Sequence, residues 1–281
     1  FIQPYNIYFT KFYIFLLFFI AYITVGDFMY FKSKDIQMYY EKYGNGNDIM
    51  LILPGWGETR KTFNKIIEYY KNIYTIYIMD YPGFGNTKFP SRDLTIYDYA
   101  LLIKEFMISE KISNPVLLAH SFGGRIAIIL TGYFNIKIEK MILMDIAGIR
   151  RKSIKRWLKQ KIYKFRKKCN VFLPKRFRKN YLKRLKNKYG STDYNSLRKN
   201  MIKTFTNVIN EDLRKYVNKI SSEVLLIWGM RDIDTPLKDG YFFNKKIKDS
   251  ALIIFPYGTH FTYLEYHIQI LSIIDCFVNN T

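Results

Sequence analysis

The feature that most constrains this chain is a regular alternation of short apolar runs with helix-length segments. Six runs are typical of strands buried on both faces, at 49–53, 73–79, 116–119, 141–144, 224–228 and 252–255. Segments with helical patterning lie between them, at 62–71, 96–110, 123–133, 237–246 and 263–277. Such alternation predicts an α/β protein with a mostly parallel sheet and helices on both faces. The sequence contains 49% hydrophobic and 18% aromatic residues, which excludes an intrinsically disordered chain.

Residues 150–219 interrupt this alternation. The stretch is polar and helix-forming, and it lacks the apolar runs expected of strands. Two shorter runs, 28–32 and 37–42, precede the alternation and are typical of two strands joined by a tight turn. We therefore expect one core built from residues 28–149 and 220–281, with residues 150–219 as a helical insertion between sheet strands.

The charge of the chain is concentrated in this insertion. The whole sequence carries 45 Lys and Arg against 23 Asp and Glu, a formal net charge of +22. Within 150–219 there are 25 basic residues and only three acidic ones, which leaves 20 basic and 20 acidic residues elsewhere. An excess of this size is typical of binding to nucleic acid or to an anionic membrane. Since no nucleic-acid motif accompanies it, we expect no nucleic-acid partner.

The amino terminus contains a long apolar segment. Residues 12–26 carry no charge, and the run 7–26 reaches the roughly 20 residues of a membrane span if Lys11 extends to the headgroups. We expect residues 1–27 to form an N-terminal hydrophobic helix that serves as a single membrane anchor. The flanking charges do not settle its orientation. A cleaved signal peptide and a buried element of the core are the alternatives.

The sequence contains no recognisable metal or nucleotide motif. Cys169 and Cys276 form neither a disulfide framework nor a metal-ligand spacing. The glycine-containing segment 83–85 lacks the third glycine and the helix start of a dinucleotide-binding loop. We therefore expect no metal and no cofactor.

A candidate nucleophile follows the run 116–119. Ser121 lies in the segment AHSFG at 119–123, a small-x-Ser-x-small pattern between a predicted strand and a predicted helix. Small residues flank the serine because larger side chains would collide with the strand and the helix. The turn exposes the hydroxyl, and the helix start presents backbone N–H groups to developing negative charge. A serine that only caps the helix is the structural alternative.

An acid and a histidine follow two later runs. Asp232 comes after the run 224–228, and His260 comes after the run 252–255. Because ligand sites form beyond the carboxyl ends of parallel strands, both should lie at the same sheet edge as Ser121. His260 would take the Ser121 proton and return it to the leaving group, and Asp232 would orient the imidazole and stabilise its cation.

On these residues the chain resembles the α/β-hydrolase superfamily, which includes lipases, esterases and related hydrolases with lids. The resemblance covers nearly everything from Phe28 onward. It rests on segments in the proper order: 53–57 (LPGWG), 80–85 (DYPGFG), 119–123 (AHSFG), 228–236 (WGMRDIDTP) and 258–260 (GTH). It implies the α/β-hydrolase fold, with residues 150–219 as a helical cap after the sixth strand.

The resemblance also implies an oxyanion hole formed by the backbone N–H groups of Trp56 and Phe122. Loss of one such donor typically costs about 2.7–4 kcal/mol of transition-state stabilisation. Pro54 stands where many relatives have histidine, so the packing of this loop is expected to differ. The glycines expected to support these loops are Gly55, Gly57 and Gly123.

Other titratable residues near the predicted site are weaker candidates. Asp234 would be the triad acid if its loop had another register, although the family spacing favours Asp232. Asp145 stands where some family members place the acid, and here it is interpreted as a hydrogen-bonding residue at a strand end. His120 is expected to pack beside the nucleophile turn.

Serine at position 121 argues against the halide- and epoxide-cleaving members of the superfamily, which use aspartate there. We expect hydrolysis of a carboxylic ester or a related acyl bond, with a small-molecule or lipidic acyl substrate, through an acyl-enzyme on Ser121. A non-catalytic or acyl-transferring protein that binds an anionic surface through its basic cap is the alternative. Basic clusters at 166–168 and 175–179 are expected to contact anionic lipid headgroups, unless they are simply the solvated faces of helices.

Overall fold

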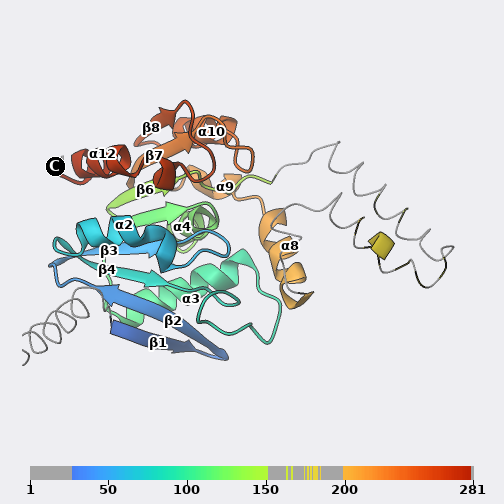
Figure 1. Ribbon diagram of the computed structural model, residues 1–281. Helices are drawn as coiled ribbons and strands as arrows, with labels where there is room; N and C mark the ends of the chain where they lie inside the picture. The colour runs from blue at the N-terminus through green and yellow to red at the C-terminus, as the bar shows by residue number, and fades with distance from the viewer. Residues whose placement is uncertain are drawn as a thin grey trace, which may run out of the picture.

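The structure is a computed structural model that describes residues 27–150 and 199–279, together with 163, 166, 174, 176, 178, 180–182 and 184. Its central element is an eight-stranded sheet (Figure 1). The strands are β1 (Asp27–Ser33), β2 (Ile36–Tyr43), β3 (Asp48–Leu53), β4 (Tyr74–Met79), β5 (Val116–His120), β6 (Lys140–Met144), β7 (Glu223–Gly229) and β8 (Ser250–Phe255). Every predicted strand is present, with its ends displaced by at most two residues.

The sheet has the order β1-β2-β4-β3-β5-β6-β7-β8. β1 and β2 form an antiparallel hairpin at one edge, and β2 also pairs antiparallel with β4. From β4 to β8 every neighbouring pair is parallel. The carboxyl ends of these six strands therefore meet at one edge of the sheet.

Helices cover both faces of the sheet. They are α2 (Arg60–Tyr70), α3 (Ile96–Ser109), α4 (Phe122–Gly132), α8 (Ile202–Asn210), α9 (Arg214–Val217), α10 (Lys238–Lys246), α11 (Thr262–Glu265) and α12 (His267–Asn279), with a 3-10 turn, η2, at Lys199–Met201. Leu51 and Leu53 of β3 pack with α3 and α4 in one apolar cluster, whereas Met50 and Ile52 pack with α2 and α12 in another. Burial on both faces explains why the parallel strands are continuous apolar runs.

The described end of the insertion is helical, as the sequence predicts. α8 and α9 lie between β6 and β7 along the chain. Leu213 and Val217 are fully buried in the cluster of α3 and α4, and the Leu213 N–H donates to the Gly148 carbonyl at 2.9 Å. The last turns of the insertion thus pack as part of the core. Most of residues 150–198 and their basic clusters lie outside the described residues.

The membrane localisation predicted from the amino terminus is wrong. In the ranges that the structure describes, no helix is long and apolar enough to cross a membrane. The predicted anchor lies outside those ranges except for Asp27, which begins β1. The prediction depended on hydrophobic length alone, and the run 7–26 reaches the roughly 20 residues that a span requires only by including the charged Lys11.

Candidate active site

Ser121 lies at a sharp turn between β5 and α4. Its φ of 47° and ψ of −108° place a non-glycine residue at positive φ, a strained conformation that recurs at functional sites. The surrounding backbone holds this conformation. The Ser121 N–H donates to the Met144 carbonyl at 3.2 Å, and the Ser121 carbonyl accepts the Ala147 N–H at 2.9 Å.

Glycines after the serine allow α4 to approach the sheet closely. A Cβ atom at Gly123 would lie 2.0 Å from the Leu53 carbonyl oxygen. A Cβ atom at Gly124 would lie 2.3 Å from the Ile146 Cβ atom. Both separations are far below any real contact distance, so the small residues of the predicted turn are required by packing.

The structure brings the three predicted catalytic side chains together in one hydrogen-bonded chain. The His260 Nε2 atom lies 2.9 Å from the Ser121 hydroxyl oxygen, and the His260 Nδ1 atom lies 2.8 Å from the Asp232 Oδ2 atom. Ser121 follows β5, Asp232 follows β7 and His260 follows β8, so all three lie at the carboxyl edge of the sheet. With Nδ1 donating to the carboxylate, Nε2 is free to accept the serine proton.

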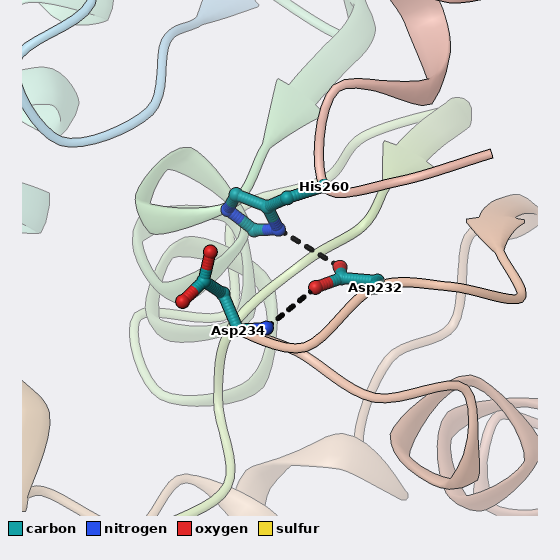
Figure 2. Close-up of side chains that lie close together, drawn as sticks. All are labelled: Asp232, Asp234 and His260. Atoms are coloured by element: carbon teal, nitrogen blue, oxygen red, sulfur yellow. Dashed lines mark hydrogen bonds and ion pairs between the residues drawn. The ribbon is translucent and has the colours of Figure 1, made fainter. Parts of the chain in front are cut away.

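The Asp232 carboxylate is held by its own loop. Its Oδ1 atom accepts the backbone N–H of Asp234 at 2.7 Å (Figure 2) and that of Thr235 at 2.9 Å. Its Oδ2 atom accepts the Thr235 hydroxyl at 2.6 Å besides the imidazole. Burial opposes ionisation, but the hydrogen bond and charge of His260 together with the Thr235 bonds hold the pKa of Asp232 below its usual value.

The charge around His260 favours its protonated form. Burial lowers the pKa of the imidazole, but the hydrogen bond and charge of Asp232, helped by Asp145 and Asp234, raise it above the ordinary value. When the imidazole takes the Ser121 proton on Nε2, Asp232 at Nδ1 would thus stabilise the resulting cation. This arrangement suits a general base that becomes a cation in the reaction.

Asp234, the alternative acid, lies beside the imidazole and is exposed. Figure 2 shows that Asp232, and not Asp234, bonds His260 Nδ1; the dashed line to Asp234 joins its backbone nitrogen to Asp232. One ligand atom from each of Asp232, Asp234 and His260 lies within 4.8 Å of the others, so these groups could also hold a cation. A cation bound to Nδ1 would displace its proton, and the hydrogen bonds account for the cluster without one.

Two backbone amides are the predicted donors of the oxyanion hole. Among the described residues, the N–H groups of Trp56 and Phe122 have no hydrogen-bond acceptor. Phe122 is the first residue of α4, where the helix dipole favours negative charge. Gly57, beside Trp56, has a φ of 79°, which a residue with a side chain rarely adopts.

Aromatic rings surround the side chain of Trp56. The half-buried Trp56 ring packs edge-to-face on Phe84 at 4.9 Å, on Phe122 at 5.1 Å and on Phe205 at 5.1 Å between centroids. Phe205 belongs to α8, and the neighbouring Thr204 hydroxyl accepts the Leu94 N–H at 3.0 Å. The described end of the insertion therefore packs on the loop of residues 53–57, the predicted oxyanion loop.

Sequence reasoning assigned no role to Glu58, which lies beside the site. Glu58 is buried and pairs with His120 at 3.0 Å. His120 packs beside the nucleophile turn, as expected, with its ring centroid 5.0 Å from that of His260. No local pattern marks this pair, because its members are separated by more than 60 residues.

Asp145 lies under the site and is completely buried. Its Oδ1 atom accepts the Gly229 N–H at 2.8 Å, in keeping with the predicted role at a strand end. Its Oδ2 atom has no hydrogen-bond partner within the described part of the chain. Burial raises the pKa of Asp145 to about 6, and the Gly229 bond opposes this shift.

Comparison with known proteins gives a consistent family. A sequence profile described as "alpha/beta hydrolase fold" matches residues 48–266. A protein of Mycoplasma genitalium named as an esterase/lipase is 26% identical over 212 residues, which cover 72% of this chain and 78% of that protein. A pimeloyl-[acyl-carrier protein] methyl ester esterase of Wigglesworthia glossinidia brevipalpis is 24% identical, covering 84% and 95%. The solved esterase (EaEST) of Exiguobacterium antarcticum superposes with a TM-score of 0.70 at 19% identity, covering 91% and 100%.

Proposed function

Since this chain belongs to the α/β-hydrolase family, an esterase- and lipase-like family of enzymes, we propose that it cleaves a carboxylic ester through an acyl-enzyme on Ser121. The observation that carries the proposal is the continuous chain of hydrogen bonds from the Ser121 hydroxyl through His260 to Asp232. A serine that only capped α4 would bond the helix amides, and the Ser121 side chain makes no such bond.

In the first step His260 Nε2 removes the Ser121 proton while the serine oxygen attacks the ester carbonyl carbon. The carbonyl oxygen becomes an oxyanion, and the N–H groups of Trp56 and Phe122 are proposed to stabilise it. The imidazolium is stabilised by Asp232. The imidazolium then gives its proton to the alcohol as the alcohol departs. The acyl group stays bonded to Ser121.

In the second step water replaces the alcohol. His260 removes a proton from the water, whose oxygen attacks the acyl carbon and forms a second oxyanion in the same hole. Collapse of this intermediate releases the carboxylic acid and returns the proton to Ser121.

The substrate is proposed to be a small-molecule ester with an apolar acyl group. The acyl chain must pass the rings that flank the two amides, Trp56 and Phe122, and these rings with Phe84 and Phe205 offer apolar contact. The relatives named for ester hydrolysis support the ester as the reacting bond.

A non-catalytic protein that binds an anionic surface through the basic insertion has less support. Such a protein has no need of a serine at positive φ, an imidazole at 2.9 Å and a buried carboxylate aligned behind it. Acyl transfer to an acceptor other than water would use the same acyl-enzyme, and product analysis distinguishes it from hydrolysis.

The proposal is tested by turnover of p-nitrophenyl esters with acyl chains of two to sixteen carbons. The wild-type protein should release p-nitrophenol with a preference among chain lengths, and Ser121→Ala should reduce kcat to background while the thermal midpoint is retained. Equal rates for the wild-type protein and a folded Ser121→Ala variant would refute the proposal.

A further inference from the structure

A second buried hydrogen-bonded chain lies behind the triad. The Glu58 Oε2 atom is 3.0 Å from His120 Nδ1, and His120 Nε2 is 2.7 Å from the backbone carbonyl oxygen of His260. The His120 side chain is 1% exposed and the Glu58 side chain 8%. This chain therefore ends on the main chain of the residue proposed as the general base.

The donors and acceptors fix where two protons lie. A carbonyl oxygen can only accept, so His120 Nε2 must carry a proton. A second proton must lie between His120 Nδ1 and Glu58 Oε2, because two acceptors at 3.0 Å would repel each other. Burial opposes ionisation of Glu58, but the charge and hydrogen bond of His120 hold the pKa of Glu58 below its usual value. The two side chains are therefore joined by a buried hydrogen bond.

The same carboxylate holds the oxyanion loop. Glu58 Oε2 also accepts the Gly55 N–H at 2.5 Å, and Oε1 accepts the Tyr263 hydroxyl at 3.2 Å. A Cβ atom at Gly55 would lie 2.7 Å from Glu58 Oε2 and 3.0 Å from His120 Nδ1. Only glycine allows the loop to lie this close to the pair.

We propose that Glu58 and His120 are positioning residues that connect the oxyanion loop, residues 53–57, to the histidine loop, residues 258–260. They would hold the Trp56 amide and the His260 imidazole at fixed positions relative to the Ser121 hydroxyl, although those two groups are some 200 residues apart in the sequence. The inference rests on the proposed ester hydrolysis. Neither residue touches the substrate; both act through the backbone of Gly55 and His260.

The test compares side chains of matched length with and without hydrogen-bonding atoms. In His120→Met and Glu58→Met the connection is lost, and kcat for a p-nitrophenyl ester should fall about 10- to 100-fold, since a displacement of about 1 Å can cost 100-fold. KM should change less than threefold. In His120→Gln the side-chain amide can still donate to the His260 carbonyl. The kcat of His120→Gln should therefore be about tenfold higher than that of His120→Met.

A matched control separates positioning from simple loss of stability. Lys140 is buried at the start of β6, at the opposite edge of the sheet, and donates to the Phe277 carbonyl at 2.9 Å. Lys140→Met should lower the thermal midpoint. Its kcat, calculated per mole of protein whose Ser121 reacts with a fluorophosphonate, should stay within twofold of wild type.

The outcomes distinguish the inference from the proposed function. If the wild-type protein turns over ester but both Met variants at positions 58 and 120 keep its kcat, the pair is only structural and the inference fails. Equal kcat for His120→Gln and His120→Met also overturns the connection through the His260 carbonyl. If the wild-type protein neither turns over ester nor reacts with a fluorophosphonate at Ser121, the proposed function fails and the inference fails with it.

Discussion

Replacement of Asp232 by asparagine tests the hydrogen bonds of the triad more stringently than removal of the side chain. The carboxylate accepts on both oxygens: Oδ1 takes two backbone N–H groups, and Oδ2 takes the imidazole and the Thr235 hydroxyl. An amide has one accepting oxygen and one donating nitrogen. It can therefore preserve only one of these two sets.

The backbone decides which set survives. If the amide nitrogen faced the N–H groups of Asp234 and Thr235, two donors would be left unpaired at a cost of about 1–3 kcal/mol each. The oxygen should therefore stay on the backbone, and the nitrogen should face His260 Nδ1. The imidazole then carries its proton on Nε2, the atom that must accept the Ser121 proton.

The expected loss follows from these energies. A preference of about 2–6 kcal/mol for the unproductive orientation, at 1.4 kcal/mol per factor of ten, lowers kcat/KM by between about 30-fold and 10⁴-fold. We expect about 10³-fold. The thermal midpoint should change little, because the backbone bonds of the loop are kept.

The assay is kcat/KM for a p-nitrophenyl ester at pH 8, with Asp234→Asn as the matched control. Asp234 is exposed and its carboxylate makes no hydrogen bond to His260 in the described residues, so its replacement should cost less than threefold. If Asp232→Asn kept a tenth of the wild-type kcat/KM while Asp234→Asn had no measurable activity, the assignment of Asp232 as the acid would be refuted.

Three further predictions concern the pH dependence of activity, the pH dependence of stability and the packing of α4. Because Asp232 raises the pKa of His260, the acid limb of kcat/KM should have its midpoint above 6.5, and a midpoint below 6 would contradict the geometry. Between about pH 4 and 6 the folded state binds the Asp145 proton and the unfolded state does not. The contribution of Asp145 to the free energy of unfolding should therefore fall by about 3 kcal/mol as pH rises through this window, and urea titrations of the wild-type protein and Asp145→Asn should differ by this fall. Gly123→Ala places a Cβ atom 2.0 Å from the Leu53 carbonyl oxygen, so kcat/KM should drop at least tenfold and the thermal midpoint should drop in a melting scan; an unchanged kcat/KM would show that α4 can shift freely.

The fold could be predicted from sequence because the parallel strands are buried on both faces. All five residues of β6 are buried, and such strands read as apolar runs with little ambiguity. The loops after β5, β7 and β8 could then be placed at one edge, which brought Ser121, Asp232 and His260 together before any geometry was known.

Features that depend on individual side-chain contacts could not be predicted. The last predicted helix, 263–277, is divided at Tyr266 into α11 and α12. The Glu265 carboxylate there accepts the Thr259 N–H at 2.8 Å, a side-chain contact with the preceding loop that leaves no periodic signal. Glu58 likewise stands in the sequence as one acid among 23, and only the position of His120 reveals its contacts. The membrane anchor predicted at the amino terminus depended on hydrophobic length alone, and that segment lies outside the described residues apart from Asp27.

The central claim is that Ser121 is an activated nucleophile, and its reaction with a fluorophosphonate tests this most directly. Intact-protein and peptide mass spectrometry of the full chain should show one adduct, located on Ser121, and none in Ser121→Ala. A folded wild-type protein that gives no adduct, or one modified only at another residue, would contradict the claim.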